Sequence, residues 1–528
     1  MGSKKLQVWL PVLFAIVMVV GMMIGYQLKD KAAGNKFFNL NRRTSIQDLV
    51  ELIRNRYVDK VNVDSINQLA ASELLSHLDP HSVYIPANKV KEANEDLMGN
   101  FQGIGVEFQI LADTVNIMHV IEGGPSEKVG LKVGDRMLAV NDTAKVAGVN
   151  ITSDGIRKLL RGEEGSTVKV QVLRDGVKRD FMIQRGVIPV SPIDAAYMIE
   201  PGTGYLRINK FADRTYEAFM LNMEKLQKQG MKQLILDLRG NGGGLLKEAI
   251  SIADAFLSGD KLIVYTEGEN MKRAEYKCST EGIFETGKLE VLIDETSASA
   301  SEVLAGALQD WDRATIIGRR SFGKGLVQQP FILSDGSEVR LTIARYYSPL
   351  GRNIQKPYAK GKAIYEEELM ERYHNGEVVV GDTAKPTGKA YKTPGGRTVY
   401  GGGGITPDVF VPMDTTHMDP AAVKLYYKST LNSYVYHYYI NNRPFFDKMK
   451  NPEQLTKEFV PGEKEWQGLV SFAKKDTINL APVTQKGKTE VLKRIQSLMA
   501  RQIWRAGGFF EVSNRTDPTI QRALEGFK

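Results

Sequence analysis

A serine-rich turn is the first place in this chain where residue types and spacing suit acyl-transfer chemistry. Residues 297–302 read Ser-Ala-Ser-Ala-Ser-Glu and join an apolar strand candidate at 289–293 to a helical run. A helix N-terminus presents unpaired backbone amides and a positive dipole end, which stabilise developing negative charge. A serine N-cap gives the same pattern, so a nucleophilic and a purely structural interpretation both stay open. Spacing alone does not choose among Ser297, Ser299 and Ser301.

Lys324 is the candidate base, because it lies between two glycines just before an apolar strand candidate. Burial there would disfavour the ammonium and lower the lysine pKa, so that a neutral amine could take a proton from a serine. Gln328 follows four residues later, on the same face of a strand, where its amide could orient the amine. An ordinary surface lysine is the alternative, since most lysines are exposed.

A glycine-rich loop opens a β-rich segment at about residues 101–185, and we expect it to bind a peptide terminus. The loop consists of Gly103, Ile104, Gly105 and Val106. Glycines let a carboxylate approach backbone N–H groups, and the strand that follows could accept the peptide as an added strand.

Two further runs support this interpretation of the β-rich segment. The loop is followed by Gly-Gly-Pro-Ser at 123–126, and then by the run Gly-Leu-Lys-Val-Gly-Asp-Arg-Met-Leu-Ala-Val-Asn at 130–141. Together these runs resemble a PDZ domain, in which a helix, here at 153–160, would form the second wall of the peptide groove. Taken alone, the loop could equally be a plain glycine turn.

Alternating strands and helices between 187 and 412 predict a layered α/β unit that positions the serine turn and the lysine. Residues 361–384 read as an insertion, and the chain becomes helical after 412. The predicted parts are a membrane anchor or signal segment (1–30), a helical N-terminal region (31–98), a PDZ domain (99–186), a serine peptidase core (187–412) and a helical C-terminal extension (413–528).

The N-terminal segment predicts a single membrane span. Residues 6–28 carry no charge, and at about 1.5 Å per residue they can cross a hydrocarbon core of roughly 30 Å. Because no clear cleavage site closes the run, we expect an uncleaved anchor, with a cleaved signal peptide as the alternative. Lys4 and Lys5 would stay in the cytoplasm, which places the rest of the chain outside it.

Composition narrows the chemistry further. The formal charge of +8 is spread along the chain and forms no basic block, so no nucleic-acid partner is expected. Cys278 is the single cysteine, and the six histidines form no metal motif or triad context, so we expect neither a cofactor nor a metal. A Ser-His-Asp protease with PDZ domains is therefore the weaker enzymatic alternative.

Over residues 40–412 the chain resembles the carboxyl-terminal processing peptidases, also called tail-specific proteases. Members pair a PDZ domain with a core that carries Ser-Ala-Ser-Ala-Ser-Glu and Phe-Gly-Lys-Gly, found here at 297–302 and 322–325. The resemblance implies a layered α/β, crotonase-like core. It also implies that Ser299 is the nucleophile, Lys324 the general base and Gln328 its support.

The same resemblance implies an oxyanion hole and a substrate class. The family run Asp-Leu-Arg-x-Asn-x-Gly-Gly stands at 237–244, so Gly244, with Gly243 as the alternative, would supply one amide and Ala300 the other. We expect an extracytoplasmic serine endopeptidase that recognises free, apolar C-termini of protein substrates and could form a homo-oligomer. A catalytically silent PDZ scaffold at the membrane is the alternative from another functional class.

Overall fold

The computed structural model describes residues 9, 11–23, 44–381, 388–414 and 419–528. The chain divides into two compact units, and the boundary along the sequence falls between Leu74 and Leu75. The first unit holds a helical stretch at 11–23, helix α2 (Ser45–Arg56) and most of α3 (Val63–Ser76). No helix within the described ranges has the length and hydropathy of a membrane span. The predicted anchor at 6–28 lies partly outside the described residues and stays a prediction.

The β-rich segment of the second unit folds as one sheet whose strands run in the order β3-β4-β5-β7-β8, with β6 beside β5. The elements are β3 (Val106–Leu111), β4 (Thr114–Val120), α5 (Pro125–Lys128), β5 (Arg136–Val140), β6 (Ala144–Lys145), α6 (Ser153–Leu160), β7 (Thr167–Arg174) and β8 (Val177–Gln184). Its own core includes Ile117, Met137 and Val170, all fully buried. Strand β2 (Asn100–Gly103) pairs with β9 (Gly186–Pro189), so the chain enters and leaves this domain along one antiparallel ribbon.

A six-stranded sheet forms the centre of the larger domain, in the order β10-β11-β12-β15-β16-β21. Its strands are β10 (Ile193–Glu200), β11 (Thr203–Ile208), β12 (Gln233–Asp237), β15 (Leu289–Ile293), β16 (Thr315–Gly318) and β21 (Val409–Phe410). All neighbours are parallel except β10 and β11. The predicted layered α/β unit is therefore confirmed.

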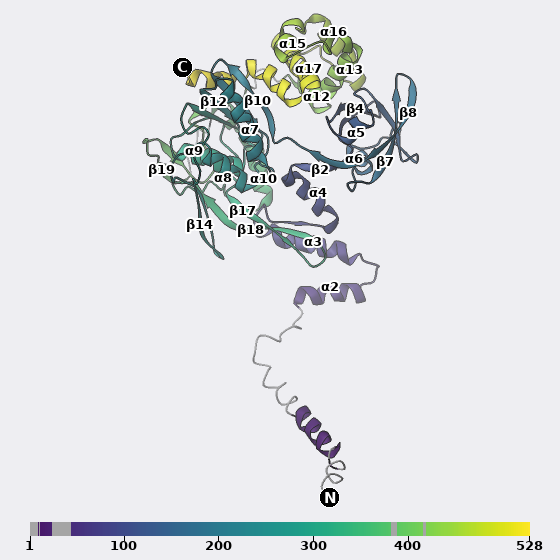
Figure 1. Ribbon diagram of the computed structural model, residues 1–528, viewed down its shortest axis with the longest axis vertical. Helices are drawn as coiled ribbons and strands as arrows, with labels where there is room; N and C mark the ends of the chain where they lie inside the picture. The colour runs from purple at the N-terminus through teal and green to yellow at the C-terminus, as the bar shows by residue number, and fades with distance from the viewer. Residues whose placement is uncertain (1–8, 10, 24–43, 382–387, 415–418) are drawn as a thin grey trace. The chain divides into compact units, whose positions relative to one another are not determined.

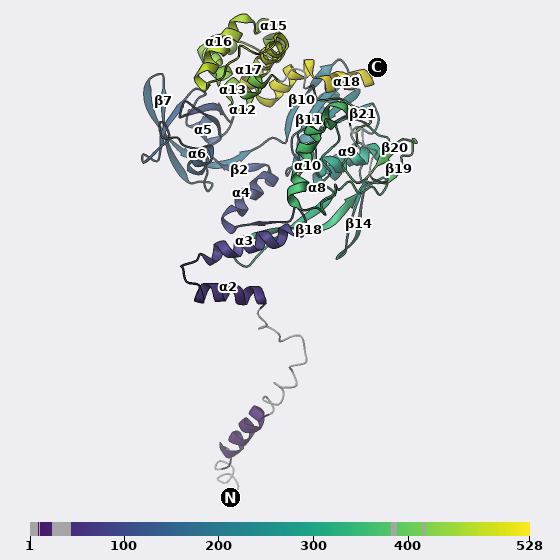
Figure 2. The same ribbon diagram turned by 180° about the vertical axis from the view of Figure 1, so that it is seen from behind.

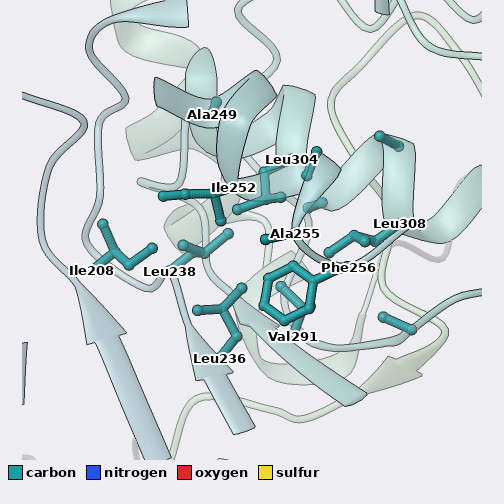
Figure 3. Packing of buried hydrophobic residues seen from close by; sticks show 14 of the residues in the cluster. Ile208, Leu236, Leu238, Ala249, Ile252, Ala255, Phe256, Val291, Leu304 and Leu308 are labelled. Atoms are coloured by element: carbon teal, nitrogen blue, oxygen red, sulfur yellow. The ribbon is translucent and has the colours of Figure 1, made fainter. Parts of the chain in front are cut away.

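Helices cover both faces of this sheet, as strand alternation requires. On one face, Leu236 and Val291 pack against α7 (Thr215–Lys228), α8 (Leu246–Asp254) and α9 (Ala300–Asp310); Figure 3 shows Leu304 of α9 and Ile252 of α8 in this cluster. On the other face, Ile235 and Leu292 pack against α18 (Pro518–Gly526) at the C-terminus, which lies beside β21 in Figure 2.

A second, antiparallel sheet carries the lysine segment. It contains β1 (Val83–Ile85), β13 (Leu262–Gly268), β14 (Met271–Lys277), β17 (Leu326–Ile332) and β18 (Glu338–Tyr347), with β18 paired to β1, β13 and β17. Helix α4 (Ala87–Met98) lies between β1 and the PDZ-like ribbon in the chain. The short strand β1 lies inside residues 31–98, which the sequence predicted as a helical N-terminal region.

The remaining elements are the insertion and the C-terminal extension (Figure 1). The insertion forms α10 (Lys362–His374) and α11 (Glu377–Val380), followed by the hairpin of β19 (Ala390–Lys392) and β20 (Thr398–Tyr400). The extension is helical, as predicted: α12 (Pro420–Tyr427), α13 (Thr430–Asn441), α14 (Arg443–Phe446), α15 (Pro452–Glu458), α16 (Glu463–Ala473), η3 (Lys474–Asp476), α17 (Gln485–Ser513), η4 (Asn514–Thr516) and α18. Most of it shares a separate core around Phe446, Leu469 and Met499.

Candidate active site

Ser299 occupies a strained position at the start of α9. Its φ of 57° and ψ of −114° lie in a region that residues with a side chain rarely adopt. The residue is the N-cap of α9, so it stands beside the unpaired amides of the first helical turn. Ala300, the first residue of that turn, is buried and carries one of those amides.

The two neighbouring serines are occupied by structural hydrogen bonds. Ser297 and Ser301 are fully buried. The hydroxyl of Ser297 donates to the carbonyl of Leu238 at 2.8 Å, and that of Ser301 donates to the carbonyl of Asn241 at 2.9 Å. Both bonds fasten the serine turn to the loop after β12, and Ser299 is left as the half-buried serine of the three.

The glycines of that loop lie against the serine turn. A Cβ built on Gly243 would stand 2.6 Å from the carbonyl oxygen of Ala298 and 2.8 Å from Ser299 Cβ, so only glycine fits. The N–H of Gly243 donates to the side-chain oxygen of Asn241 at 2.9 Å. Because that amide is engaged, Gly244 is the better placed of the two predicted glycines to offer an N–H to substrate.

A buried ion-pair network holds the start of the same loop. Asp237 is fully buried, and its carboxylate pairs with Arg239 and Arg207 at 2.8 Å each. Burial alone would raise the pKa of Asp237, but the two guanidinium groups outweigh it and lower that pKa. Arg239 also pairs with Asp517 at 2.8 Å, which ties the loop after β12 to the N-cap of α18.

Glu302 joins the serine turn to the segment around Lys324, a role that was not predicted from the sequence. One carboxylate oxygen, Oε2, accepts the N–H of Ser299 and the N–H of Lys324, both at 2.8 Å. The other accepts the N–H of Gly323 at 2.7 Å and the hydroxyl of Ser321 at 2.5 Å. Burial raises the pKa of Glu302 although these bonds oppose the shift. Its position three residues after an N-cap serine is the sequence signal that could have indicated it.

The Lys324 amine is half-buried and donates to Oε1 of Gln328 at 3.0 Å. Burial lowers the pKa of Lys324, while the carboxylates of Glu302 and Asp79 partly oppose that shift. The structure thus brings the two residues together as expected. However, contrary to the sequence prediction, they do not share a face of one regular strand. Lys324 precedes β17, and the register of β17 shifts between Val327 and Gln328.

Gln328 is in turn fixed by the segment before β1. Its side-chain N–H donates to the carbonyl of His81, and the ring of His81 hydrogen-bonds to the Tyr365 hydroxyl at 2.8 Å. Asp79 accepts the N–H of His81 at 2.8 Å. Burial, followed by the charge of Lys324, lowers the pKa of His81 to about 4, so this ring is neutral at ordinary pH. No sequence pattern indicated this role for His81, because the six histidines form no metal motif or triad context.

The insertion supports the lysine turn from outside. Arg372 of α10 donates to the carbonyls of Ser321 and Phe322 at 2.8 and 3.2 Å. A second buried lysine, Lys356, pairs with Glu368 at 2.7 Å and lies over the ring of Phe322. Burial lowers the pKa of Lys356 as it does that of Lys324, although Glu368 opposes the shift. The two lysines differ in their partners, because the amine of Lys356 is engaged by a carboxylate and that of Lys324 by the neutral amide of Gln328.

The predicted peptide loop lines a groove of about 350 Å³ between β3 and α6. Gly103, Ile104, Gly105 and Val106 form one end, and Ser153 and Leu160 of α6 line the opposite wall. Gly105 has a φ of 75°, which favours glycine. Within the described ranges, no group of three or more His, Cys, Asp or Glu could hold a metal.

Comparison with known proteins finds matching families for three parts of the chain. Residues 202–361 match Peptidase family S41, residues 102–184 match the PDZ domain, and residues 422–505 match a family of unknown function, DUF8443. The carboxy-terminal-processing protease of Bartonella bacilliformis is 34% identical over 346 residues, which cover 64% of this chain and 78% of that protein. The chain belongs to the carboxy-terminal processing proteases. It is a serine-type peptidase, so the silent-scaffold alternative is set aside.

Two other known proteins are similar to this chain. A probable CtpA-like serine protease of Staphylococcus haemolyticus is 33% identical to this protease over 67% of this chain and 69% of that protein. A solved photosystem II D1 C-terminal processing protease is 30% identical, covers 59% of this chain and 84% of its own, and has a TM-score of 0.35.

Proposed function

We propose that this protease cleaves polypeptides with a Ser299/Lys324 dyad. The observation that carries the proposal is the shared oxygen of Glu302, which accepts the backbone N–H of both residues at 2.8 Å. The backbone nitrogens of Ser299 and Lys324, which belong to loops of different sheets, are thereby held within two hydrogen-bond lengths of each other. Lys324 also has the lowered pKa that a lysine base needs.

In this mechanism the neutral amine of Lys324 takes the proton of Ser299 as the hydroxyl attacks the scissile carbonyl. The amides of Gly244 and Ala300 then donate hydrogen bonds to the oxyanion. Lys324 returns the proton to the leaving amine, and an acyl-enzyme forms on Ser299. Water, deprotonated by the same amine, releases the acyl group, and Gln328 keeps the amine oriented throughout.

A serine-directed fluorophosphonate probe tests the assignment of the nucleophile. Digestion and mass spectrometry should locate the adduct on Ser299, and labelling should rise with pH as Lys324 loses its proton. Ser299→Ala should abolish labelling. An adduct that persists in Ser299→Ala, on Ser297 or Ser301, would contradict the proposed dyad.

The PDZ groove is proposed to bind the free carboxyl terminus of substrates, with an apolar final side chain in the space between β3 and α6. A charge-assisted hydrogen-bond set is worth on the order of 1.5 to 3 kcal/mol, so amidation of the terminus should weaken binding by roughly tenfold or more. Binding to inactive Ser299→Ala protein by fluorescence anisotropy measures this difference. Equal affinity for the free-acid and amidated peptides would refute the assignment.

We further propose that residues 6–28 anchor the protein in the cytoplasmic membrane, with the catalytic domain outside the cytoplasm. The uncharged run and its flanking lysines support this placement. Proteolysis of intact spheroplasts should then reach the catalytic domain, and the protein should fractionate with membranes. Self-association, which the family resemblance suggests, should show as a higher mass in sedimentation of the detergent-solubilised chain.

A further inference from the structure

The C-terminal helices dock on the face of the PDZ sheet that points away from its core. Gln502 of α17 donates to the carbonyl of Met118 on β4 at 3.0 Å, and Gln109 of β3 donates to the hydroxyl of Ser433 on α13 at 3.5 Å. Arg505 of α17 forms an ion pair with Glu107 of β3. Strand β3 therefore has the peptide groove along its edge and the C-terminal helices on its outer face.

A polar crevice of about 220 Å³ lies between the PDZ sheet and the C-terminal helices α13 and α17. The polar residues that line it are Glu107, Gln109, Asn432, Arg501, Gln502 and Arg505. Glu107 and Phe108 line both this crevice and the peptide groove. The two spaces thus meet along β3, and a peptide in the groove would pass the mouth of the crevice.

Strand geometry fixes which peptide side chains would face the crevice. A peptide added to β3 runs antiparallel to it, with its last residue opposite Val106 at the carboxylate loop. The penultimate residue then lies opposite Glu107, and the residue two positions further upstream lies opposite Gln109. Residues directly opposite in an antiparallel pair point to the same face. Val106, Phe108 and Ile110 pack on the PDZ core, so these two peptide side chains would point outward, toward α17.

The charges there favour an acidic peptide. Arg505 is matched by Glu107, whereas Arg501, four residues earlier on α17 and before the break in that helix at Trp504 and Arg505, adds a second guanidinium at the exposed rim. The crevice therefore has a net positive charge, with Asn432 and Gln502 as further N–H donors. A guanidinium is matched best by a carboxylate.

We propose that this crevice is a second recognition subsite, which takes an acidic side chain at the peptide position opposite Gln109, two residues upstream of the penultimate residue. The inference rests on the proposed binding of C-termini in the PDZ groove. It assigns the C-terminal extension a direct part in substrate choice.

Peptide binding to the full-length Ser299→Ala protein tests the proposal. Three free-acid peptides with one apolar C-terminal residue would carry Glu, Gln or Lys at this position. The Glu peptide should bind about three- to tenfold more tightly than the Gln peptide, and the Lys peptide more weakly than either, which corresponds to roughly 0.6 to 1.4 kcal/mol for the first difference. The preference should shrink as salt rises, because the rim is exposed.

Arg501→Gln should remove most of the preference for Glu without changing the affinity of the Gln peptide. Arg522→Gln, an exposed arginine of α18 outside the crevice, is the matched control and should keep the preference. If all three peptides bind equally, or if Arg501→Gln keeps the full preference, the subsite is refuted while C-terminal recognition stands. If amidated and free-acid peptides also bind equally, both proposals fail.

Discussion

Replacement of Glu302 by glutamine should lower turnover and weaken the fold at the same time. Four donors converge on this buried carboxylate, two on each oxygen. Glutamine keeps the shape but turns one acceptor oxygen into an NH₂ group. If the NH₂ faces Ser299 and Lys324, both of their amides lose an acceptor; if it faces the other way, the N–H of Gly323 loses one.

The loss of folding stability follows from the number of buried donors that are left without an acceptor. Each unsatisfied buried donor costs about 1–3 kcal/mol, so Glu302→Gln should lower the free energy of unfolding by about 1–6 kcal/mol. Removal of a buried charge offsets part of this loss, which places the expected value toward the lower end. If the NH₂ faces Ser299 and Lys324, the two reacting loops no longer share an acceptor, and kcat should fall by about 10²-fold or more at a temperature where the variant is folded. In the other orientation both N–H groups keep a shared acceptor, but a neutral amide oxygen accepts more weakly than a carboxylate, so the fall in kcat should be smaller.

Urea unfolding and peptide turnover on the same preparation measure both effects. Glu290→Gln is the matched control, because Glu290 is equally buried but lies on β15 with Oε2 unpartnered. That variant should keep wild-type kcat. If Glu302→Gln retained wild-type kcat while folded, the shared carboxylate would not be what positions the dyad.

Three further predictions concern pH and backbone space. The kcat/KM should rise with pH as Lys324 loses its proton, and the controlling pKa should lie below the roughly 10.4 of an exposed lysine; a pH–rate profile measures it. Gly243→Ala should nearly abolish turnover because its Cβ would meet Ala298, whereas Gly242→Ala, with nothing within 4 Å, should not, as a peptide assay of both would show. Burial raises the pKa of Glu290 to about 7, above its unfolded value. The stability that the protonated carboxyl contributes at low pH should therefore be lost as pH rises through about 7. Urea unfolding at several pH values should show this loss in wild type and not in Glu290→Gln.

Local sequence patterns were sufficient to predict individual loops, strands and helices. The glycine loop at 103–106, the strand at 289–293 and the helix after Ser299 all stand where spacing and composition placed them. The choice of Ser299 over its neighbours required the family resemblance. In the structure the distinction is physical, since the other two hydroxyls are consumed by the carbonyls of Leu238 and Asn241.

Contacts between distant segments could not be predicted in the same way. The bond between Gln328 and the carbonyl of His81 joins residues 247 positions apart, and it depends on β1 adding to β18. The pairing of Arg239 with Asp517 spans 278 positions and depends on where α18 packs. No periodicity within either segment encodes its partner, so these supports of the site emerged only from the fold.

Turnover by Lys324→Ala tests the central claim most directly. On an unstructured polypeptide substrate, kcat/KM should fall by about 10²- to 10⁴-fold or more, as expected for the loss of a general base. Ser299→Ala should be as inactive, because the effects of removing members of one catalytic unit are not additive. Lys324→Arg should fail as well, because a guanidinium stays protonated. Near-normal activity in Lys324→Ala, with the protein folded and Ser299→Ala inactive, would contradict the Ser299/Lys324 mechanism.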